Sequence, residues 1–481
     1  MEHIIGRIQE QKQLSRLLES PEAELLALYG RRRIGKTFLI RNAYEKQILF
    51  EFAGVHHASL KKQLELFARA LSQTSGLPIA TPVSWTEAFD QLIAFLEPKI
   101  KKHKKVVFID EFPWLHTPRS GFSEAFEQFW NMWATRQKNL VVVICGSAAA
   151  WMIKHIINNR GGLHNRVTAR MRLQPFTLAE AEAFLKSRSI QLDRYQLIQL
   201  YMVMGGVPQY LKAVDRGDSL TTAVDRICFS PDGFLHHEFK NLFQSLFDTS
   251  QNHMAVVKAL AKTPSGLTRN ELIKACNLHT GGGTTQLLDE LRESGFIEAY
   301  TPFGKTSKDS VYQLIDEFSL FYFKFMAEGK IQGPGSWTRY SSSSSWTSWC
   351  GLAFEHLCLK HVDQIKYALG ISGVFSENYV WRHVAAGDEG AQIDLLIDRQ
   401  DQCINVCEMK FSRYEFEITK KYAQDLERKL RVFQSSTRTK KTLFLTMVTT
   451  NGLKNPSNYR GLIQREITMD ALFHPKNESC V

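Results

Sequence analysis

The hydrophobic pattern changes character several times along the chain, and each change predicts a different kind of structure. Three short apolar runs, at residues 25–29, 106–109 and 140–144, have the length of buried strands. Helical patterns occupy residues 37–43, after the first run, and 122–136, between the second and the third. Because strands that alternate with helices form parallel sheets with both faces covered, this part of the chain predicts an α/β domain.

The pattern between residues 177 and 246 is helical throughout, which indicates a small helical lid. Three helices and a hairpin are expected next, with helices at residues 255–260, 268–272 and 284–294 and strands at 296–300 and 311–315. Three helices followed by a hairpin resemble a winged helix. The third helix carries almost as many acidic as basic side chains, so a protein or another domain is as suitable a partner for it as DNA.

A stretch rich in glycine, proline and serine, residues 333–345, marks a linker. The linker is expected to pack against another part of the protein, because three tryptophans lie beside it: Trp337, Trp346 and Trp349. Beyond residue 350, the pattern predicts a further α/β unit, with a helix at 352–362, a strand pair within 392–410 and basic helices at 420–434. At roughly 150 residues per domain, 481 residues would divide into about three units.

The amino-acid composition excludes some classes of protein but does not identify the function. The chain has 60 Lys and Arg against 49 Asp and Glu, and this net charge of +11 hints at a polyanionic partner. No apolar run reaches the roughly 18 residues of a membrane span, and residues 1–7 lack the features of a secretory signal, so we expect a cytoplasmic protein. None of the eight cysteines forms a Cys-x-x-Cys pair, which favours buried thiols over a zinc site.

A glycine-rich segment follows the first strand and opens the first helix. It consists of Gly30, Arg31, Arg32, Arg33, Ile34, Gly35, Lys36 and Thr37. In this Gly-x4-Gly-Lys-Thr pattern, the glycines let backbone N–H groups turn toward phosphates, the lysine reaches the β and γ phosphates, and the threonine hydroxyl binds Mg²⁺. The strand before the loop and the helix after it are the context that this chemistry needs. The segment therefore predicts a nucleotide site of the P-loop type with ATP and Mg²⁺ as cofactors.

Two acidic residues and a serine complete the predicted nucleotide site. The strand at 106–109 ends in Asp110 and Glu111, where the aspartate can hold the Mg²⁺ shell and the glutamate can polarise the attacking water. Ser147 follows the next strand and can sense the γ phosphate. An arginine usually meets the charge of the transition state, and the candidates are Arg160, Arg166 and Arg170.

A second group of chemically useful residues lies near the carboxy terminus. Asp394 sits in an apolar strand, and Glu408 and Lys410 are two residues apart, so they share one face of the next strand. Glu355 lies on the helix before them. Carboxylates and a lysine on adjacent strands can bind one or two Mg²⁺ ions and hold an attacking water, which is the chemistry of phosphodiester hydrolysis.

The first 215 residues resemble the AAA+/STAND-like ATPases known as archaeal-type ATPases. The resemblance rests on Ile5-Gly6-Arg7 with Glu10, on the loop and the two acids described above, and on three later motifs: Gly146-Ser147, the run from Arg166 through Leu173-Gln174-Pro175-Phe176, and Gly205-Gly206-Val207-Pro208. It implies that Arg166 is the arginine before the Leu-x-Pro-Phe motif and that Gly206 to Pro208 close over the nucleotide. The carboxy-terminal group resembles the PD-(D/E)xK nuclease core, with Asp394 as the motif aspartate, Glu408 and Lys410 as the E-x-K pair, Glu355 as the first-helix acid and Gln424 as an addition.

The expected fold is α/β: a P-loop NTPase parallel sheet with a helical lid, a winged-helix domain and a PD-(D/E)xK-like α/β domain. The corresponding boundaries are 1–176, 177–248, 249–316, a linker at 317–350, and 351–481. The expected function is an ATPase that controls a Mg²⁺-dependent nuclease acting on DNA, with a homo-oligomer formed through the ATPase domain. Two alternatives stay open: an ATP-switched regulator that only binds DNA or protein, and a signalling scaffold that oligomerises on ATP.

Overall fold

The computed structural model describes residues 3–157, 165–246, 250–327, 335–383, 390–455, 459 and 461–475. The chain forms two compact units, Met1–Pro175 and Phe176–Val481. None of the helices in the described ranges is both long and apolar enough to cross a membrane.

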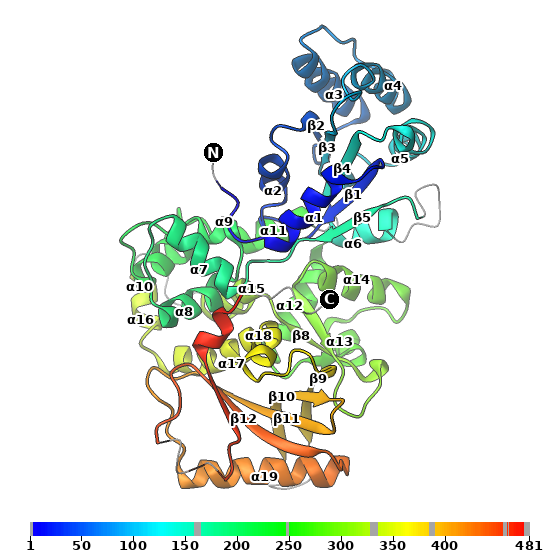
Figure 1. Cartoon of the computed structure of the whole chain (residues 1–481). Coiled ribbons are helices and arrows are strands. Elements are labelled where there is room, and N and C mark those ends of the chain that lie inside the picture. The colour runs from blue at the N-terminus through cyan, green and yellow to red at the C-terminus, as the bar shows by residue number, and fades with distance from the viewer. Residues whose placement is uncertain are drawn as a thin grey trace. The chain divides into compact units, whose positions relative to one another are not determined.

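The first unit is built on a five-stranded parallel sheet with the order β2-β3-β4-β1-β5 (Figure 1). Its strands are β1 (Glu24–Tyr29), β2 (Ile48–Ala53), β3 (Lys105–Asp110), β4 (Leu140–Gly146) and β5 (Ala169–Arg172). The three predicted strands are confirmed as the three inner ones. The two edge strands have no continuous apolar run, because β5 alternates buried and exposed residues and β2 is only partly buried.

Helices cover both faces of this sheet. They are α1 (Ile8–Glu19), α2 (Lys36–Ala43), α3 (Leu60–Ser75), α4 (Trp85–Leu96), α5 (Phe122–Gln128), which continues into a π-helical turn at Phe129–Trp133, and α6 (Ala149–Met152). Leu25 and Ala27 of β1 pack in one core with α3 to α5, whereas Leu26 and Leu28 pack in a second core with α1 and α2. Burial on both faces explains why the inner strands read as unbroken apolar runs.

The second unit opens with the predicted helical region. Its helices are α7 (Leu178–Ser187), α8 (Arg194–Met204), α9 (Pro208–Leu211), α10 (Leu220–Val224) and α11 (Glu238–Leu246). Both α7 and α8 begin with reciprocal capping boxes, Thr177 with Glu180 and Asp193 with Gln196. Such caps satisfy backbone N–H groups at the first turn and so set where each helix starts.

Three helices and a small antiparallel sheet follow, coloured green in Figure 1. They are α12 (Ser250–Lys262), α13 (Arg269–Cys276) and α14 (Gly282–Glu293), with strands β6 (Leu267–Thr268), β7 (Ile297–Tyr300) and β8 (Val311–Leu314) in the order β6-β8-β7. The helices and the hairpin lie where the sequence predicted them. The short strand β6 was not predicted.

The described parts of the segment expected to be a linker, residues 317–327 and 335–350, are largely helical, and its tryptophans pack as expected. Residues 317–350 include α15 (Glu317–Phe321), α16 (Ser336–Tyr340) and the first part of α17 (Ser344–Lys360). Trp337 is 1% exposed, and its ring lies 4.7 Å from that of Trp346. The expected boundary near residue 350 therefore falls inside a helix, because the serine-rich composition that suggested it supplies the cap of α17, Ser343.

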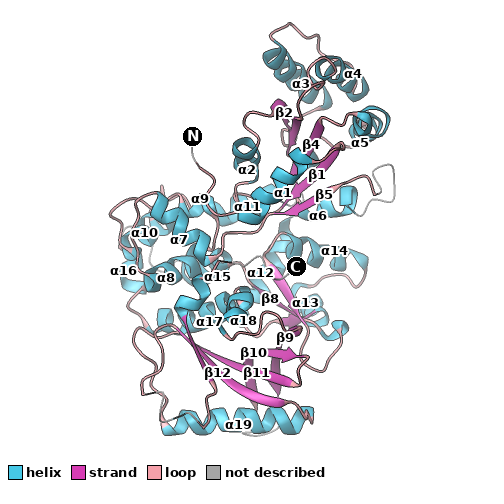
Figure 2. Ribbon diagram, in the orientation of Figure 1, coloured by secondary structure: helices cyan, strands magenta, loops and turns pink. Residues whose placement is uncertain are grey.

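The carboxy-terminal sheet is mixed, with the order β13-β12-β11-β10-β9. Its strands are β9 (Ser376–His383), β10 (Ala391–Arg399), β11 (Cys403–Lys410), β12 (Thr442–Thr449) and β13 (Arg465–Thr468), and the helices of the same region are α18 (Val362–Ala368) and α19 (Lys420–Thr437). Strands β9 to β11 are antiparallel, and α19 connects β11 to its parallel neighbour β12 (Figure 2). Leu426 and Phe433 of α19 pack in one core with β10 to β12, whereas α17 packs in the other core.

Candidate functional sites

The phosphate loop lies between the end of β1 and the start of α2. Gly30 has a φ of +149°, and a Cβ atom at this position would lie 2.4 Å from the backbone oxygen of Leu173. Gly35 and Arg33 also have positive φ values, +89° and +69°. Glycine is required at Gly30 for steric reasons, because the loop passes against the backbone that follows β5.

Lys36 is buried at the start of α2, and its side chain turns back into the loop. Its Nζ donates hydrogen bonds to the backbone oxygens of Gly30 and Arg31, both at 2.9 Å. Arg31 and Ile34 are buried as well, whereas Arg32 and Arg33 are partly exposed. The loop therefore holds the ammonium group of Lys36 within its own curve.

Thr37 and Asp110 meet although they are 73 residues apart in the sequence. The Thr37 hydroxyl donates to Oδ2 of Asp110 over 2.6 Å, and Asp110 is buried at the end of β3. A hydroxyl beside a carboxylate at the first turn of a helix offers the hard oxygen donors that Mg²⁺ prefers. These two residues therefore fit a magnesium ion.

Glu111 and Ser147 also lie together, in an arrangement that the sequence did not predict. Glu111 has a φ of +45°, and its Oε2 accepts hydrogen bonds from both the backbone N–H and the hydroxyl of Ser147, at 3.2 and 2.8 Å. Ser147 is 1% exposed. In this structure the serine holds the glutamate carboxylate.

The other residues predicted for the nucleotide site lie outside the loop in the sequence. Arg166 is exposed in the turn before β5, and Arg160 lies outside the described residues. Pro208 starts α9 in the second unit. Gly206, two residues earlier, has a local structural role, because a Cβ there would lie 1.9 Å from the backbone oxygen of Phe176, and its own carbonyl accepts the Phe176 N–H at 2.6 Å.

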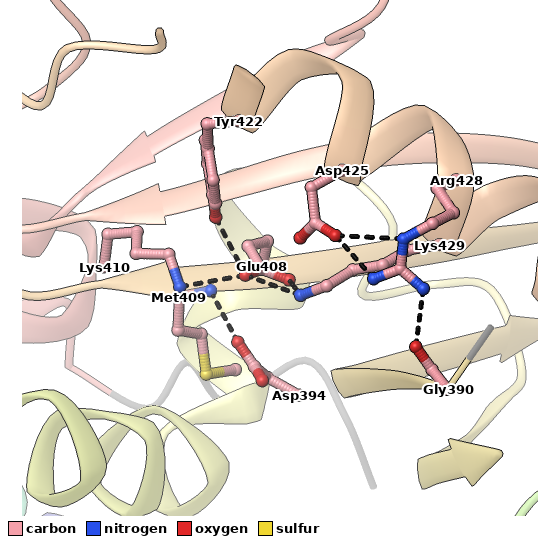
Figure 3. Close-up of polar contacts among 9 residues, drawn as sticks. All are labelled: Gly390, Asp394, Glu408, Met409, Lys410, Tyr422, Asp425, Arg428 and Lys429. Carbon is pink, nitrogen blue, oxygen red and sulfur yellow. Dashed lines mark hydrogen bonds and ion pairs between the residues drawn. The ribbon is translucent and has the colours of Figure 1, made fainter. Parts of the chain in front are cut away.

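The predicted carboxy-terminal residues occupy adjacent antiparallel strands. Asp394 lies on β10, and its Oδ2 accepts the backbone N–H of Met409 on β11 at 3.0 Å (Figure 3). Glu408 and Lys410 flank Met409, and their side chains form an ion pair with 2.9 Å between Nζ and Oε1. The structure thus brings the three residues to one place on the sheet. Gln424, on α19, is exposed.

Two residues of α19 that the sequence analysis missed also contact Glu408. The Tyr422 hydroxyl donates to Oε1 at 2.8 Å, and Nζ of Lys429 lies 3.0 Å from Oε1 and 2.8 Å from Oε2 (Figure 3). Tyr422 and Lys429 are seven residues apart and alternate with the buried Leu426 and Phe433. A lysine within the apolar stripe of a helix is the sequence signal that would have found this contact.

The three carboxylates of this cluster have pKa values shifted in different directions. Burial, together with the charge of Asp394, raises the pKa of Glu355 to about 8. Burial and the charge of Glu408 likewise raise the pKa of Asp394 to about 7. Burial also acts to raise the pKa of Glu408, but Lys410 and Lys429 outweigh it and hold that pKa below its ordinary value. The two lysines outweigh burial at Glu408, whereas at Glu355 and Asp394 burial and the neighbouring carboxylates outweigh the lysines.

The carboxylates fit a divalent cation only in part. Burial and the neighbouring carboxylates disfavour ionisation of Glu355 and Asp394 more than Lys410 and Lys429 favour it, and a bound cation would add positive charge. Nevertheless, within the described ranges no three His, Cys, Asp or Glu side chains are grouped closely enough to hold a metal ion. The third acid, Glu408, faces lysines instead.

Comparison with known proteins agrees with the first of these two sites. Residues 5–214 match the family described as an ATPase domain predominantly from Archaea. An uncharacterized protein of Methanocaldococcus jannaschii is 24% identical over 434 residues, which cover 88% of this chain and 91% of that protein.

Two solved structures match part of the chain at low identity. One is a Walker-type ATPase of Pyrococcus abyssi, with a TM-score of 0.46 and 16% identity over 67% of this chain and 96% of the other. The second is the ORC2 protein of Aeropyrum pernix in ADPNP–ADP complexes, with a TM-score of 0.44 and 16% identity over 67% and 94%. The family match and the geometry of the loop together support an ATPase domain of the P-loop type within residues 5–214.

Proposed function

We propose that this ATPase controls a Mg²⁺-dependent nuclease domain in its carboxy-terminal sheet, and that the substrate is DNA. The observation that carries the proposal is the meeting of Asp394, Glu408 and Lys410 on two neighbouring strands. Glu355 joins them electrostatically from α17. Acidic oxygen donors beside a lysine are the groups that phosphodiester hydrolysis requires.

In the nucleotide site, the proposed roles are those of the P-loop pattern. Backbone N–H groups of residues 30–37 would surround the phosphates, and Lys36 would turn from its loop carbonyls to the β and γ phosphates. Thr37 and Asp110 would hold Mg²⁺, which would shield the phosphate charge. Glu111 orients the attacking water once it leaves Ser147, and Ser147 is then able to sense the γ phosphate.

Arg166 is the arginine that we assign to the transition state. Its exposure suits a side chain that reaches the γ phosphate of a neighbouring copy, so the proposal includes a homo-oligomer formed through the ATPase domain. Pro208 is assigned to the nucleotide from the second unit. Both assignments come from the family resemblance.

In the carboxy-terminal site, a divalent cation when bound lowers the pKa of water and stabilises charge on the phosphate. Asp394 and Glu355 are the residues that would hold it. Lys410, whose pKa is raised by Glu408 and Asp394 against the opposing effect of burial, stays protonated and holds the developing negative charge on the phosphodiester. Glu408 keeps the ammonium group of Lys410 in place.

Surface charge supports DNA as the substrate. The net charge of the chain is +11, and the exposed cations on the elements that carry or follow the site residues include Arg413 after β11 and Lys420, Lys421 and Arg431 on α19. Exposed lysines and arginines bind a phosphate backbone regardless of sequence. The elements α12 to α14 with their hairpin, which resemble a winged helix, offer a second contact to DNA or to a protein.

Cleavage assays test the proposal directly. The intact chain should cut single-stranded or plasmid DNA with Mg²⁺ or Mn²⁺, at a rate that depends on ATP. Asp394→Ala and Lys410→Ala should lower cleavage by about 100-fold or more, because each removes a group that stabilises the transition state. Excess metal should partly restore only Asp394→Ala. The matched control is Lys454→Ala, which removes a surface lysine that pairs with Glu417.

A second candidate function is an ATP-switched regulator whose nuclease-like domain is inactive. The observation in its favour is that Glu408 is held by two lysines and that no group of three potential metal ligands forms among the described residues. If the intact chain cuts no single-stranded, duplex or branched DNA with either metal, with ATP or a non-hydrolysable analogue, the nuclease proposal fails. The regulator reading then stands if DNA binding weakens steeply with salt.

A further inference from the structure

The segment that follows β11, residues 411–416, presents an exposed aromatic ring that the proposed function leaves without a role. Tyr414 is 74% exposed, and the guanidinium carbon of Arg413 lies over its ring, 5.8 Å from the ring centre. Within the part of the chain that the structure describes, the Tyr414 hydroxyl makes no hydrogen bond. A single exposed ring is ordinary on a protein surface, so its significance depends on what holds it and what surrounds it.

Both ends of this segment are fixed to the domain by aromatic side chains. Phe411 packs against Tyr195 and Phe354, with ring centres 5.1 and 5.8 Å away. At the other end, Phe416 packs against Tyr422 of α19, with 5.4 Å between the ring centres. The two phenylalanines turn toward the core, whereas the three residues in the middle of the segment are exposed.

Hydrogen bonds from the loop after β12 hold the backbone that carries Tyr414. The Thr450 hydroxyl accepts the N–H of Ser412 at 2.9 Å. The Asn451 side chain donates to the carbonyl oxygens of Ser412 and Arg413 at 3.0 and 3.1 Å, and the Ser412 hydroxyl donates to the carbonyl oxygen of Tyr414 at 2.6 Å. A ring displayed on a fixed backbone loses less conformational entropy when it binds a ligand.

The charged residues that flank this ring in the sequence have both signs, which favours a single strand over a duplex as its ligand. Lys410 precedes the segment with 29% of its side chain exposed, and Lys420 and Lys421 follow it on α19. Between them lie two exposed acids, Glu415 and Glu417, of which the second pairs with a surface lysine. Mixed charge limits the attraction for a phosphate backbone. An unpaired base can stack on an exposed ring, whereas the bases of a duplex already stack on one another.

On the basis of the proposed function, in which DNA is the partner, we infer that Arg413 and Tyr414 form a stacking platform that binds a base of single-stranded DNA. The Tyr414 ring supplies a flat surface for the base, and the planar guanidinium of Arg413 adds a cation that stacks on a base or contacts a phosphate. Three residues span at most about 11 Å, so a strand held on the platform comes within reach of Lys410. Binding to the platform requires no metal ion.

Binding of a fluorescent oligothymidylate of about 15 nucleotides to the full chain, in EDTA and without nucleotide, tests this inference. Tyr414→Ala should weaken binding about tenfold, because the stacking of one base is lost, and Tyr414→Phe should bind as the wild type, because stacking does not need the hydroxyl. The matched control is Phe375→Ala, which removes a ring that is 69% exposed just before β9 and should leave the affinity unchanged. No binding by the wild type, unchanged affinity in Tyr414→Ala, or an equal loss in Phe375→Ala would overturn the inference.

Photocrosslinking locates the bound base. An oligonucleotide that carries 5-iododeoxyuridine should crosslink under ultraviolet light to the peptide that contains Tyr414. A crosslink found only within residues 250–314 would place the strand on α12 to β8 and overturn the inference.

The binding measurements contain no metal, so the platform and the proposed nuclease can fail separately. If the wild type cuts DNA and Tyr414→Ala binds the oligonucleotide as the wild type does, the nuclease stands and the platform is overturned. If the wild type cuts no DNA and Tyr414→Ala loses binding, the platform stands and the nuclease is overturned.

Discussion

Glu111 was expected to polarise the attacking water, but in the structure its carboxylate contacts Ser147. Its carboxylate accepts hydrogen bonds from Ser147, so the proposed role of Glu111 in hydrolysis would require this contact to open. Glu111→Gln should bind ATP with about the wild-type affinity and lower kcat by about 100-fold or more, because an amide cannot act as a general base. Steady-state turnover together with nucleotide-binding measurements gives the two values. Unchanged turnover would remove Glu111 from catalysis.

Glu355 allows a prediction about pH. An unfolded glutamate has a pKa of about 4.3, whereas the folded value here is about 8. Between these values the folded chain holds a proton that the unfolded chain has lost, so this group lowers stability as the pH rises from about 4 to about 8. In EDTA, Glu355→Gln should therefore have a higher Tm than the wild type at pH 8, by about 2 °C or more, and nearly the same Tm at pH 5.

Adding metal should reverse the order of the two Tm values at pH 8. If Glu355 binds the cation, Mn²⁺ should raise the Tm of the wild type at pH 8 more than that of Glu355→Gln, because only the carboxylate gains a compensating charge. Glu427→Gln, which changes an exposed acid of α19, should behave as the wild type in both buffers. Equal metal-induced shifts in wild type and Glu355→Gln would show that Glu355 is not a ligand.

At the scale of elements, the loop between β1 and α2 depends on one close backbone approach. Gly30→Ala should destabilise the protein by about 1–3 kcal/mol and weaken nucleotide binding, because its Cβ would lie 2.4 Å from the Leu173 oxygen at a φ of +149°. Gly76→Ala is a useful comparison, since Gly76 also has a positive φ, +73°, but has open space around its Cβ position. Denaturant unfolding should show a larger loss for Gly30→Ala than for Gly76→Ala.

One stripe of helix α19 both packs the helix on the sheet and makes polar contacts with Glu408. Leu426 and Phe433 pack it on the sheet, while Tyr422 and Lys429 on the same stripe place donors at Glu408. Its exposed residues include Lys420, Lys421 and Arg431 together with Gln424 and the acidic Glu427. The packing face thus builds the site, whereas the exposed face has mixed polarity.

At the scale of the whole molecule, the two candidate sites lie in different compact units. Lys36→Ala should abolish ATP hydrolysis, because a neutral side chain cannot replace the charge on the β and γ phosphates, and it should leave Mn²⁺ binding at Asp394 unchanged. Asp394→Ala should leave ATP hydrolysis within about twofold of the wild type. A larger effect on ATP hydrolysis would mean that the sites are coupled energetically.

The sequence by itself determined the local structures. The Gly-x4-Gly-Lys-Thr pattern predicted the loop between β1 and α2, because the motif is defined by consecutive residues, and the apolar runs predicted the inner strands, because those are buried on both faces. The spacing of Glu408 and Lys410 placed both on one face of β11. The edge strands β2 and β5 were missed, because they are only partly buried.

Only the tertiary structure decided which distant residues meet. It paired Thr37 with Asp110, Glu111 with Ser147, and Glu408 with Lys429, contacts that span from 21 to 73 residues. It also placed residues 336–340 and 344–350, within the expected linker, in helices, where Trp337 and Trp346 bury their rings. Local patterns describe how a segment folds on itself, whereas the orientation of a charged side chain depends on the partners that packing brings to it.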